Sequence, residues 1–259
     1  MWFCKSLPAA VLICVLGLGT HGLQAERPVS RASSPLEPSA PAVLDTPVVR
    51  VDIFYETLCP DCQSLLGEKL TAIWEDPVLR SALNVHLHPS GNAELTGVGN
   101  AQELNCQHGT DECHGNAVHA CAMKVWEPEN YLPVVMCMEA KSPESAADID
   151  KAFSSCAKAR NLSIHEVASC LSASTEVQSM MFGHYHATQA LKPPHEWVPW
   201  VLLNGEHDYH ADMGELHEAI CNLLRAGDGA PASCRHVASL AEQQQNSTTA
   251  QLCYAGKRT

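Results

Sequence analysis

The sequence has no cluster of basic residues, because its 16 lysines and arginines are scattered among 29 aspartates and glutamates. The formal net charge is −13 over 259 residues. A nucleic-acid-binding domain concentrates positive charge on one face or along one helix, and this chain offers no such footprint. We therefore expect no nucleic-acid partner, whereas the acidic balance itself selects no function.

A long apolar run that could cross a membrane is also missing. The best candidate, Ala9 to Leu18, is shorter than the roughly 20 residues that a spanning helix needs. Lys5 precedes it and small residues near Gly22 to Ala25 follow it, which is typical of a secretory signal peptide over residues 1–25. We expect a mature protein without a membrane anchor, either lumenal or secreted.

The remaining chain divides by composition into three parts and shows no internal repeat. Residues 26–47 are rich in Pro, Ser and Ala, which predicts a linker or pro-segment. Residues 48–225 carry the periodic apolar segments of a folded domain. Residues 226–259 are polar and predict a C-terminal tail that processing could remove.

The chain contains 13 cysteines, a density that predicts disulfides behind a signal peptide. When the two in the signal peptide and the Cys59/Cys62 pair are set aside, an odd number remains. One thiol is then free or bonded to another chain. We expect it to be Cys234 or Cys253, because a tail can reach a partner, and so expect a disulfide-linked homodimer of the precursor.

The motif Cys59-Pro60-Asp61-Cys62 lies between the apolar run Val48–Tyr55 and the helix-like stretch Gln63–Leu70. The order strand, Cys-x-x-Cys, helix is typical of a thioredoxin-like redox domain. An isolated motif of this kind could instead form a structural disulfide or half of a zinc site, and the flanking segments favour the redox interpretation.

The two motif cysteines are expected to have different roles. The N-terminus of a helix favours the thiolate, so Cys59 is the predicted nucleophile, and Cys62, one turn later, is the predicted resolving thiol. Pro60 suits the first helical position, whereas an ionised Asp61 opposes the thiolate. Activity at acidic pH needs a Cys59 pKa toward the low end of the range of about 3.5–7 found for such thiols.

The core sheet is expected to contain a second strand at Ala82–His88 and to resume at Trp197–Leu203. The dipeptide Asn204-Gly205 then predicts a hairpin turn. Thioredoxin-like domains place a cis-proline beside the active disulfide at the start of a strand, so Pro199 is the third predicted site residue, with a cis Val198–Pro199 bond. An ordinary trans proline at a strand start is the alternative.

Residues from about 91 to 192 are predicted to form a disulfide-rich, mainly helical insertion, with helices at Asn116–Trp126, Ser163–Ser172 and Thr175–Ala190. Six cysteines lie in it: Cys106, Cys113, Cys121, Cys137, Cys156 and Cys170. Some of these, together with the histidines His108, His114 and His119, could bind zinc. The oxidising compartment favours disulfides, and we expect no metal and no cofactor.

Other polar residues carry weaker signals. Glu56, three residues before Cys59, could relay a proton to the buried thiol, but a strand-end carboxylate in solvent is the favoured interpretation. The sequons at Asn161 and Asn246 are candidate glycosylation sites of a secretory protein.

The spacing Cys106-Gln107-His108-Gly109-x-x-Glu112-Cys113-x-x-Asn116-x-x-x-x-Cys121 resembles the signature of the gamma-interferon-inducible lysosomal thiol reductase family. Tyr55–Cys59, Val135–Glu139 and Leu191–Val201 are also similar to that family, and the resemblance spans about residues 48–224. The relatives have Gly after the first active-site cysteine where this chain has Pro60, a difference that bears on the reduction potential.

The resemblance implies a thioredoxin-like enzyme that reduces protein disulfides in acidic endosomes and lysosomes, aiding antigen processing and protein degradation. Its expected partners are disulfide-bonded protein substrates and a small-thiol reductant. Two alternatives stay open: a disulfide oxidase or isomerase of the secretory pathway, and a non-catalytic cysteine-rich binding protein.

Overall fold

The computed structural model describes residues 48–225, 231–235 and 253–254. The expected signal peptide over residues 1–25 and the expected linker over residues 26–47 lie outside the described residues. Most of the expected tail over residues 226–259, including the sequon at Asn246, lies outside them as well.

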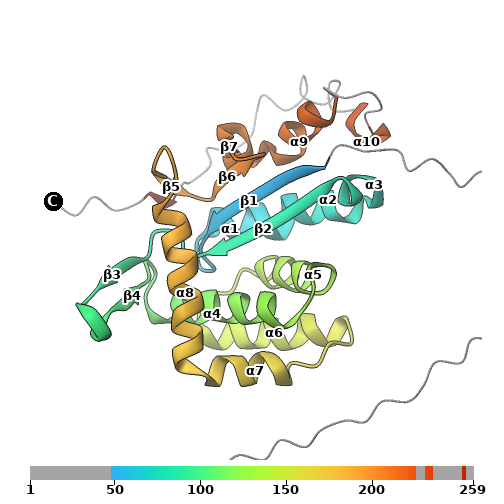
Figure 1. Cartoon of the computed structure of the whole chain (residues 1–259). Helices are drawn as coiled ribbons and strands as arrows, with labels where there is room; N and C mark the ends of the chain where they lie inside the picture. Colours follow the sequence, from blue (N-terminus) through green and yellow to red (C-terminus); the bar gives the residue numbers. More distant parts are fainter. Residues whose placement is uncertain (1–47, 226–230, 236–252, 255–259) are drawn as a thin grey trace, which may run out of the picture. The chain divides into compact units, whose positions relative to one another are not determined.

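A four-stranded sheet in the order β2-β1-β6-β7 forms the centre of the fold (Figure 1). Strand β1 (Val49–Tyr55) pairs in parallel with β2 (Leu83–Pro89) and antiparallel with β6 (Trp200–Leu203). Strand β6 turns into β7 (Glu206–His207) at Asn204-Gly205, whose φ angles of 53° and 88° suit these two residue types. The predicted first and second strands and the predicted hairpin turn are confirmed, whereas the strand predicted over Trp197–Leu203 belongs to this sheet only from Trp200 onward.

The two faces of β1 carry different side chains, because alternate residues of a strand point to opposite faces of the sheet. Val51 and Ile53 are fully buried in the main core. On the other face, Phe54 and Trp200 pack beside α8 (Ser174–Gln189), which crosses the sheet near the end of β1 (Figure 1). Both faces are therefore covered at the end of the strand that leads into the cysteine motif.

Two helical stretches contribute to the main core. The first runs on from the cysteine motif and contains α1 (Pro60–Ser64), the π-helical η1 (Leu65–Leu70) and α2 (Thr71–Glu75). The second contains the π-helical η3 (Ala211–Glu215) and α9 (Leu216–Arg225). Their buried leucines and isoleucines join those of the sheet in one hydrophobic cluster, so the predicted first and last helices are confirmed.

Short elements complete the sheet region. Helix α3 (Pro77–Ser81) precedes β2, and α10 (Ala232–Arg235) follows α9. A separate two-stranded sheet joins β5 (Trp197–Val198) to β8 (Cys253–Tyr254), with Val198 opposite Cys253. Two described residues near the C-terminus therefore pair with a strand of the folded domain.

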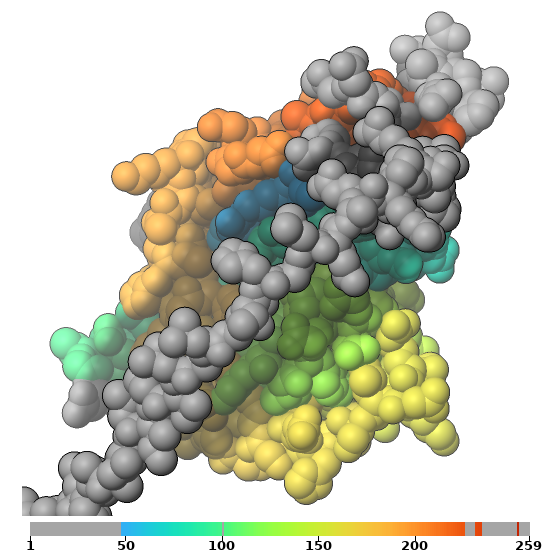
Figure 2. Space-filling view, turned by 45° about the vertical axis from the view of Figure 1, so that its right-hand side comes forward, coloured from blue at the N-terminus to red at the C-terminus, as the bar shows by residue number. Residues whose placement is uncertain are grey.

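Between β2 and β5 lies a mainly helical segment, shown in green to orange in Figure 1. It opens with a hairpin of β3 (Glu94–Thr96) and β4 (Glu103–Asn105), joined through the short 3₁₀ turn η2 (Gly99–Ala101). The helices that follow are α4 (Thr110–Val125), α5 (Pro128–Glu139), α6 (Ala146–Ala159), α7 (His165–Ser172) and α8. Figure 2 shows the green and yellow residues of this segment packed as a continuous mass below the sheet.

Helix α5 was not predicted from the sequence, and its prolines explain why. Pro128 is at the start of the helix, but Pro133 lies inside it, where a proline ordinarily breaks the hydrogen-bond ladder. The carbonyl of Glu129, which an N–H at position 133 would have bonded, accepts a hydrogen bond of 3.4 Å from the guanidinium of Arg160. Arg160, which follows helix α6, thus supplies the donor that Pro133 lacks. A local sequence pattern does not reveal this contact.

Three disulfides hold the inserted segment together. Cys121–Cys170 joins α4 to α7, Cys137–Cys156 joins α5 to α6, and Cys106–Cys113 closes the loop that enters α4. Closing loops of 19 and 49 residues stabilises a fold by roughly 3–4 kcal/mol each in the chain-entropy description. The predicted thioredoxin-like sheet with a disulfide-rich, mainly helical insertion is confirmed. Among the described residues, no helix combines the length and apolar character that crossing a membrane requires.

Asp212 is a buried carboxyl that ties β5, β6 and β7 together. It accepts hydrogen bonds from the Val201 backbone N–H at 2.7 Å and from the Trp197 indole N–H at 2.9 Å, and it lies 2.7 Å from His207 Nε2. Burial raises the pKa of Asp212 to about 6, although these hydrogen bonds oppose the shift. The folded protein therefore holds the Asp212 proton more tightly than the unfolded chain does.

This raised pKa predicts a pH dependence of stability. The contribution of Asp212 is fully present below its unfolded pKa of 3.8 and is lost as pH rises through about 6, a change on the order of 2–3 kcal/mol. Urea unfolding from pH 4 to pH 7, with the disulfides intact, should show a smaller loss of stability in Asp212→Asn than in the wild type. Glu215→Gln, at an exposed position of η3, is the control and should follow the wild type. Equal slopes for Asp212→Asn and wild type would contradict the assignment.

Candidate active site

The Cys59-Pro60-Asp61-Cys62 motif begins helix α1, as predicted. Cys59 is the N-cap residue, with extended backbone angles of φ −79° and ψ 119°, and Pro60 occupies the first turn. Cys62 lies one turn into the helix, and both cysteines are fully buried. Their thiols are unbonded and within hydrogen-bonding contact of each other, so the structure places a dithiol at the start of this helix.

Pro199 lies between β5 and β6, in the segment that meets the cysteine motif. The Val198–Pro199 peptide bond is cis, which confirms the prediction for this bond. The Cys59 thiol donates to the carbonyl oxygen of Val198 at 3.8 Å. The predicted neighbourhood of Cys59, Cys62 and Pro199 is therefore present, although the three residues come from segments about 140 positions apart.

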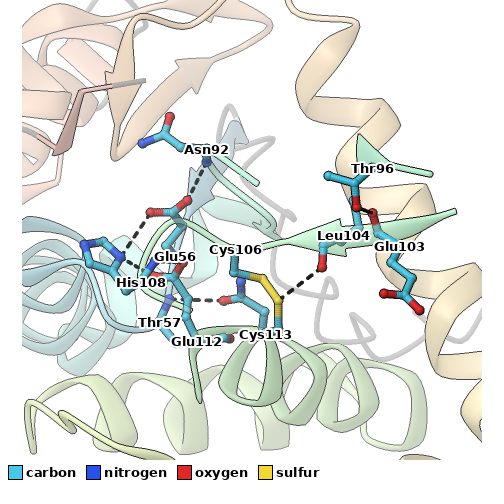
Figure 3. The surroundings of a disulfide bond; sticks show 11 residues. Glu56, Thr57, Asn92, Thr96, Glu103, Leu104, Cys106, His108, Glu112 and Cys113 are labelled. Carbon is cyan, nitrogen blue, oxygen red and sulfur yellow. Dashed lines mark hydrogen bonds and ion pairs between the residues drawn. A yellow bond between two sulfur atoms is a disulfide. The ribbon is translucent and has the colours of Figure 1, made fainter. Parts of the chain in front are cut away.

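Glu56 is the residue that sequence reasoning placed wrongly. We expected a carboxylate in solvent, but Glu56 is fully buried. Its Oε1 accepts a hydrogen bond of 2.5 Å from the backbone N–H of Asn92, and its Oε2 lies 3.7 Å from His108 Nδ1 (Figure 3). Gly91 permits this approach, because it has a φ of +42° and any Cβ there would lie 2.3 Å from the Glu56 side chain. No pattern around Glu56 itself could have revealed partners so distant in the sequence.

Helix α4 holds the loop that leads from Glu56 to the cysteine motif. The backbone N–H of Thr57 donates to Asn116 Oδ1 at 3.1 Å. The Thr57 hydroxyl donates to the carbonyl of Glu112 at 3.3 Å, and Figure 3 labels both of these residues. On the other side, the Gln63 amide donates to the carbonyl of Thr57 at 2.9 Å. The backbone immediately before Cys59 is thus fixed from both sides.

A carboxylate–histidine cluster lies beside this loop. His108 Nδ1 is 2.5 Å from Glu112 Oε2, and the backbone N–H of His108 donates to Glu112 Oε1 at 3.0 Å (Figure 3). Glu56, His108 and Glu112 bring one ligand atom each to within 4.8 Å of one another, which is metal-site spacing. Hydrogen bonds account for Glu56 Oε1, both Glu112 oxygens and His108 Nδ1, whereas Glu56 Oε2 is buried without a hydrogen-bond partner among the described residues.

Burial dominates the ionisation of the site. It raises the pKa of the Cys62 thiol to about 11 and raises the pKa of Glu56 well above its usual range, with Glu112 adding to the effect on Glu56. For Cys59, a hydrogen bond with Cys253 favours the thiolate, but contact with Cys62 and burial outweigh it and raise the pKa. The Cys59 pKa is therefore raised, not lowered as expected, while the thiol is covered and in contact with Cys62, a covering that the sequence did not show.

The tail cysteines are both part of the folded domain. Cys234 forms a disulfide with Cys221 of α9, so its expected bond to another chain is wrong. Cys253 is a free thiol, and its Sγ lies 2.7 Å from Cys59 Sγ. The described residues thus contain three free cysteines, Cys59, Cys62 and Cys253, and the contacts among their thiols join them in one group.

Comparison with known proteins agrees with this geometry. The family model described as gamma interferon inducible lysosomal thiol reductase (GILT) matches residues 50–160. The gamma-interferon-inducible lysosomal thiol reductase of Carassius auratus is 35% identical over 191 residues, covering 72% of each chain. That of Mus musculus is 34% identical over 206 residues, covering 79% of this chain and 76% of the relative.

The chain belongs to the GILT family. A gamma-interferon-responsive lysosomal thiol protein of Arabidopsis thaliana is 32% identical over 216 residues, covering 82% of this chain and 86% of the relative. Among solved structures, Chlamydia trachomatis DsbA is 13% identical with a TM-score of 0.49, covering 74% of this chain and 91% of that one.

The structure gives five residues of the GILT signature a physical task. Cys106 and Cys113 close the turn before α4, and Cys121 anchors the middle of α4 to α7. These bonds confirm the expectation that the cysteines form disulfides, and the alternative in which they bind zinc is wrong. Glu112 and Asn116, between the cysteines, bond the loop before the cysteine motif. The signature therefore describes the clamp that holds the dithiol.

The signature helix also carries a buried histidine. His119 is fully buried, with Nδ1 2.9 Å from the Tyr55 hydroxyl and Nε2 3.5 Å from Glu139 Oε1. Burial lowers the pKa of His119 to about 3 and raises that of Glu139 well above its usual value. Both side chains are therefore neutral, and His119 is structural, as expected from the sequence.

Gly115 offers a test of the contact between α4 and the motif loop. A Cβ at this position would lie 2.4 Å from the Thr57 hydroxyl and 2.9 Å from Ile149 Cδ1. Gly115→Ala should therefore lower the free energy of unfolding by about 1–3 kcal/mol and make Cys59 react faster with a thiol-alkylating reagent, because the loop is displaced. Urea unfolding and alkylation kinetics measure the two effects.

Gly183 provides the matched control. It lies in helix α8 with no atom within 4 Å of an added Cβ. Gly183→Ala should stabilise the protein by about 0.5–1 kcal/mol, because alanine has the higher helix propensity, and should leave Cys59 reactivity unchanged. Similar behaviour of the two variants would show that Gly115 does not position the loop.

Proposed function

We propose that this chain reduces disulfide bonds of protein substrates in acidic endosomes and lysosomes. As a GILT-family member with a thioredoxin-like fold, it is a thiol-disulfide oxidoreductase. The observation that carries the proposal is the free dithiol of Cys59 and Cys62 at a helix start, in a chain that locks eight other cysteines in disulfides. A purely structural Cys59–Cys62 disulfide would not need the hydrogen bonds from α4 and Gln63 that fix the loop before it.

The proposed reaction has two exchange steps. The Cys59 thiolate attacks one sulfur of a substrate disulfide, forming a mixed disulfide and releasing the other sulfur as a thiolate. Cys62 then attacks Cys59 Sγ, releases the second substrate sulfur and leaves a Cys59–Cys62 disulfide. Two electrons pass from the dithiol to the substrate, and a small-thiol reductant restores the dithiol for the next cycle.

Pro199 and Glu56 assist these steps in our proposal. Pro199 follows the Val198 carbonyl that contacts Cys59, so it shapes the surface where the substrate meets the thiol. The Glu56 backbone donates a hydrogen bond to the Cys62 sulfur, and the charge of the Glu56 carboxylate acts on the same thiol. A carboxylate with a raised pKa is a better match for a thiol of pKa about 11, so Glu56 is the proposed acceptor of the Cys62 proton at pH values above its own pKa.

Two kinds of feature support the proposed location in an acidic lumen. The relatives that carry the name lysosomal thiol reductase span most of the chain. The expected signal peptide leads into the secretory pathway, and the sequon residue Asn161 is exposed in the turn after α6, where a glycan can be attached. In such a compartment, reduction of disulfides would open folded proteins for degradation and antigen processing.

Substitution of the two thiols tests the proposed roles. Cys59→Ser should abolish reduction of a disulfide-bonded protein such as insulin, because no mixed disulfide can form. Cys62→Ser should instead accumulate a covalent enzyme–substrate complex that non-reducing electrophoresis separates from free enzyme. If the reduced protein is alkylated first at Cys62 rather than Cys59, the roles are reversed. A measured reduction potential in the range of disulfide oxidases would favour an oxidase over a reductase.

Glu56→Gln tests the proton acceptor. The amide resembles the protonated carboxyl already favoured by burial, so the fold should persist, while release of substrate from the mixed disulfide should slow by roughly 100-fold above the Glu56 pKa. In the wild type, this step should accelerate as pH rises through that pKa, and in the variant the dependence should disappear. Glu68→Gln, at an exposed position of the same helical stretch, is the control. Parallel pH profiles for Glu56→Gln and the wild type would rule out the role.

A further inference from the structure

Cys253 occupies the position that a substrate cysteine would take. Strand β8 pairs antiparallel with β5, with Cys253 opposite Val198, the residue whose carbonyl contacts the Cys59 thiol. The two sulfurs, Cys253 Sγ and Cys59 Sγ, are 2.7 Å apart, which is within reach of the roughly 2.05 Å of a disulfide. The thiol of the chain's own C-terminal segment therefore faces the proposed nucleophile.

Main-chain and side-chain contacts add to the sulfur contact in holding Cys253 there. The carbonyl of Cys253 accepts a hydrogen bond of 3.0 Å from the Asn92 amide, and Asn92 is the residue whose backbone N–H holds Glu56. His195 Nε2 lies 3.2 Å from Asn92 Oδ1 and braces the same amide. Peptides often bind by adding a strand to an exposed edge, where main-chain bonds give affinity and one side chain enters the site. Strand β8 has this form.

The cysteine pairing makes the contact more significant. Each of the other eight described cysteines outside the motif has a disulfide partner. Cys253 is the odd cysteine that the sequence predicted, and it lies against Cys59.

We propose that Cys253 is a third redox-active cysteine, which docks beside Val198 as an internal substrate and forms a reversible disulfide with Cys59. The proposal rests on the proposed function of the Cys59–Cys62 pair. In the exchange, the Cys253 thiolate attacks Cys59 Sγ of the Cys59–Cys62 disulfide. The Cys59–Cys62 bond breaks, the Cys59–Cys253 bond forms, and Cys62 leaves as a thiolate that takes up the proton lost by Cys253. No external oxidant or reductant is consumed.

This exchange would regulate access to the site. While strand β8 occupies the edge of β5, an external protein segment must displace it to reach Cys59, and the Cys59–Cys253 disulfide would make the occupation covalent. Attack by Cys62, or by a small-thiol reductant, on Cys59 Sγ releases Cys253 and opens the edge. The β5 edge thereby favours extended, cysteine-containing segments as substrates, because strand β8 with Cys253 is itself such a segment.

Disulfide mapping tests the proposal directly. Full-length Cys62→Ser, equilibrated in a glutathione redox buffer that supplies the oxidant, is quenched with acid, alkylated and digested. Mass spectrometry of the monomer should detect a peptide pair joined through Cys59 and Cys253. In Cys62→Ser/Cys253→Ser the pair should be absent. Alkylation of both Cys59 and Cys253, or a linked pair found only in a disulfide-linked dimer, would overturn the proposal.

A second measurement keeps Cys62 intact. Cys253→Ser in the full chain should increase the alkylation rate of reduced Cys59 by roughly tenfold and lower KM for a protein disulfide, since the internal occupant is no longer held by its thiol. Ala232→Ser, at an exposed position of α10, is the control and should match the wild type. Unchanged Cys59 reactivity in Cys253→Ser would count against internal docking.

The mapping needs no reductase activity, so it separates this proposal from the proposed function. Insulin reduction by the wild type without a Cys59–Cys253 link would refute the internal substrate and leave the reductase intact. A Cys59–Cys253 link in a protein that reduces no protein disulfide would support the internal docking and refute the reductase.

Discussion

The hydrogen bond from the Thr57 backbone to the Asn116 side chain is the contact on which the site depends. It joins the loop before the cysteine motif to helix α4, which belongs to the inserted segment and not to the sheet. The neighbouring bond from the Thr57 hydroxyl to the Glu112 carbonyl fixes the same loop. Because Cys106–Cys113 and Cys121–Cys170 fix the ends of that part of α4, the disulfides of the insertion also position the dithiol. The insertion is therefore part of the active site rather than an addition to it.

Sequence patterns were sufficient for several elements whose cause is local, although helix α6, which the Ser145 side chain caps, was not predicted. The alternating apolar residues of β1, the Asn204-Gly205 turn and the helix after Cys59 follow from side-chain period, turn chemistry and the position of Pro60. Cysteine content behind a signal peptide predicted disulfides, but geometry was needed to pair them, because spacing does not encode connectivity. Helix α5 was missed because the group that compensates for Pro133 comes from Arg160.

The site residues also divide into those that short motifs predict and those that long-range contacts place. Cys59, Cys62 and Pro199 belong to short motifs whose order along the chain could be recognised, and the structure brings them together. Glu56 carries no such motif, and its burial involves Asn92 and His108, residues brought to it by the turn after β2 and by the signature turn. The placement of Cys253 depends on strand pairing across more than 50 residues, with Val198 as partner. Long-range contacts of this kind are invisible to periodicity.

The buried pair His119–Glu139 couples the stability of the fold to pH in two opposite directions. A charged pair 3.5 Å apart in the core would cost more in desolvation than it gains, so the pair is kept neutral, with the Glu139 pKa raised and the His119 pKa lowered to about 3. Their effects on stability have opposite signs. The Glu139 contribution is lost as pH rises through its folded pKa, whereas the His119 contribution is lost as pH falls below 6.5 toward 3. Acidification thus strengthens one member of the pair while weakening the other, and the disulfides that do not titrate supply the stability that is independent of pH.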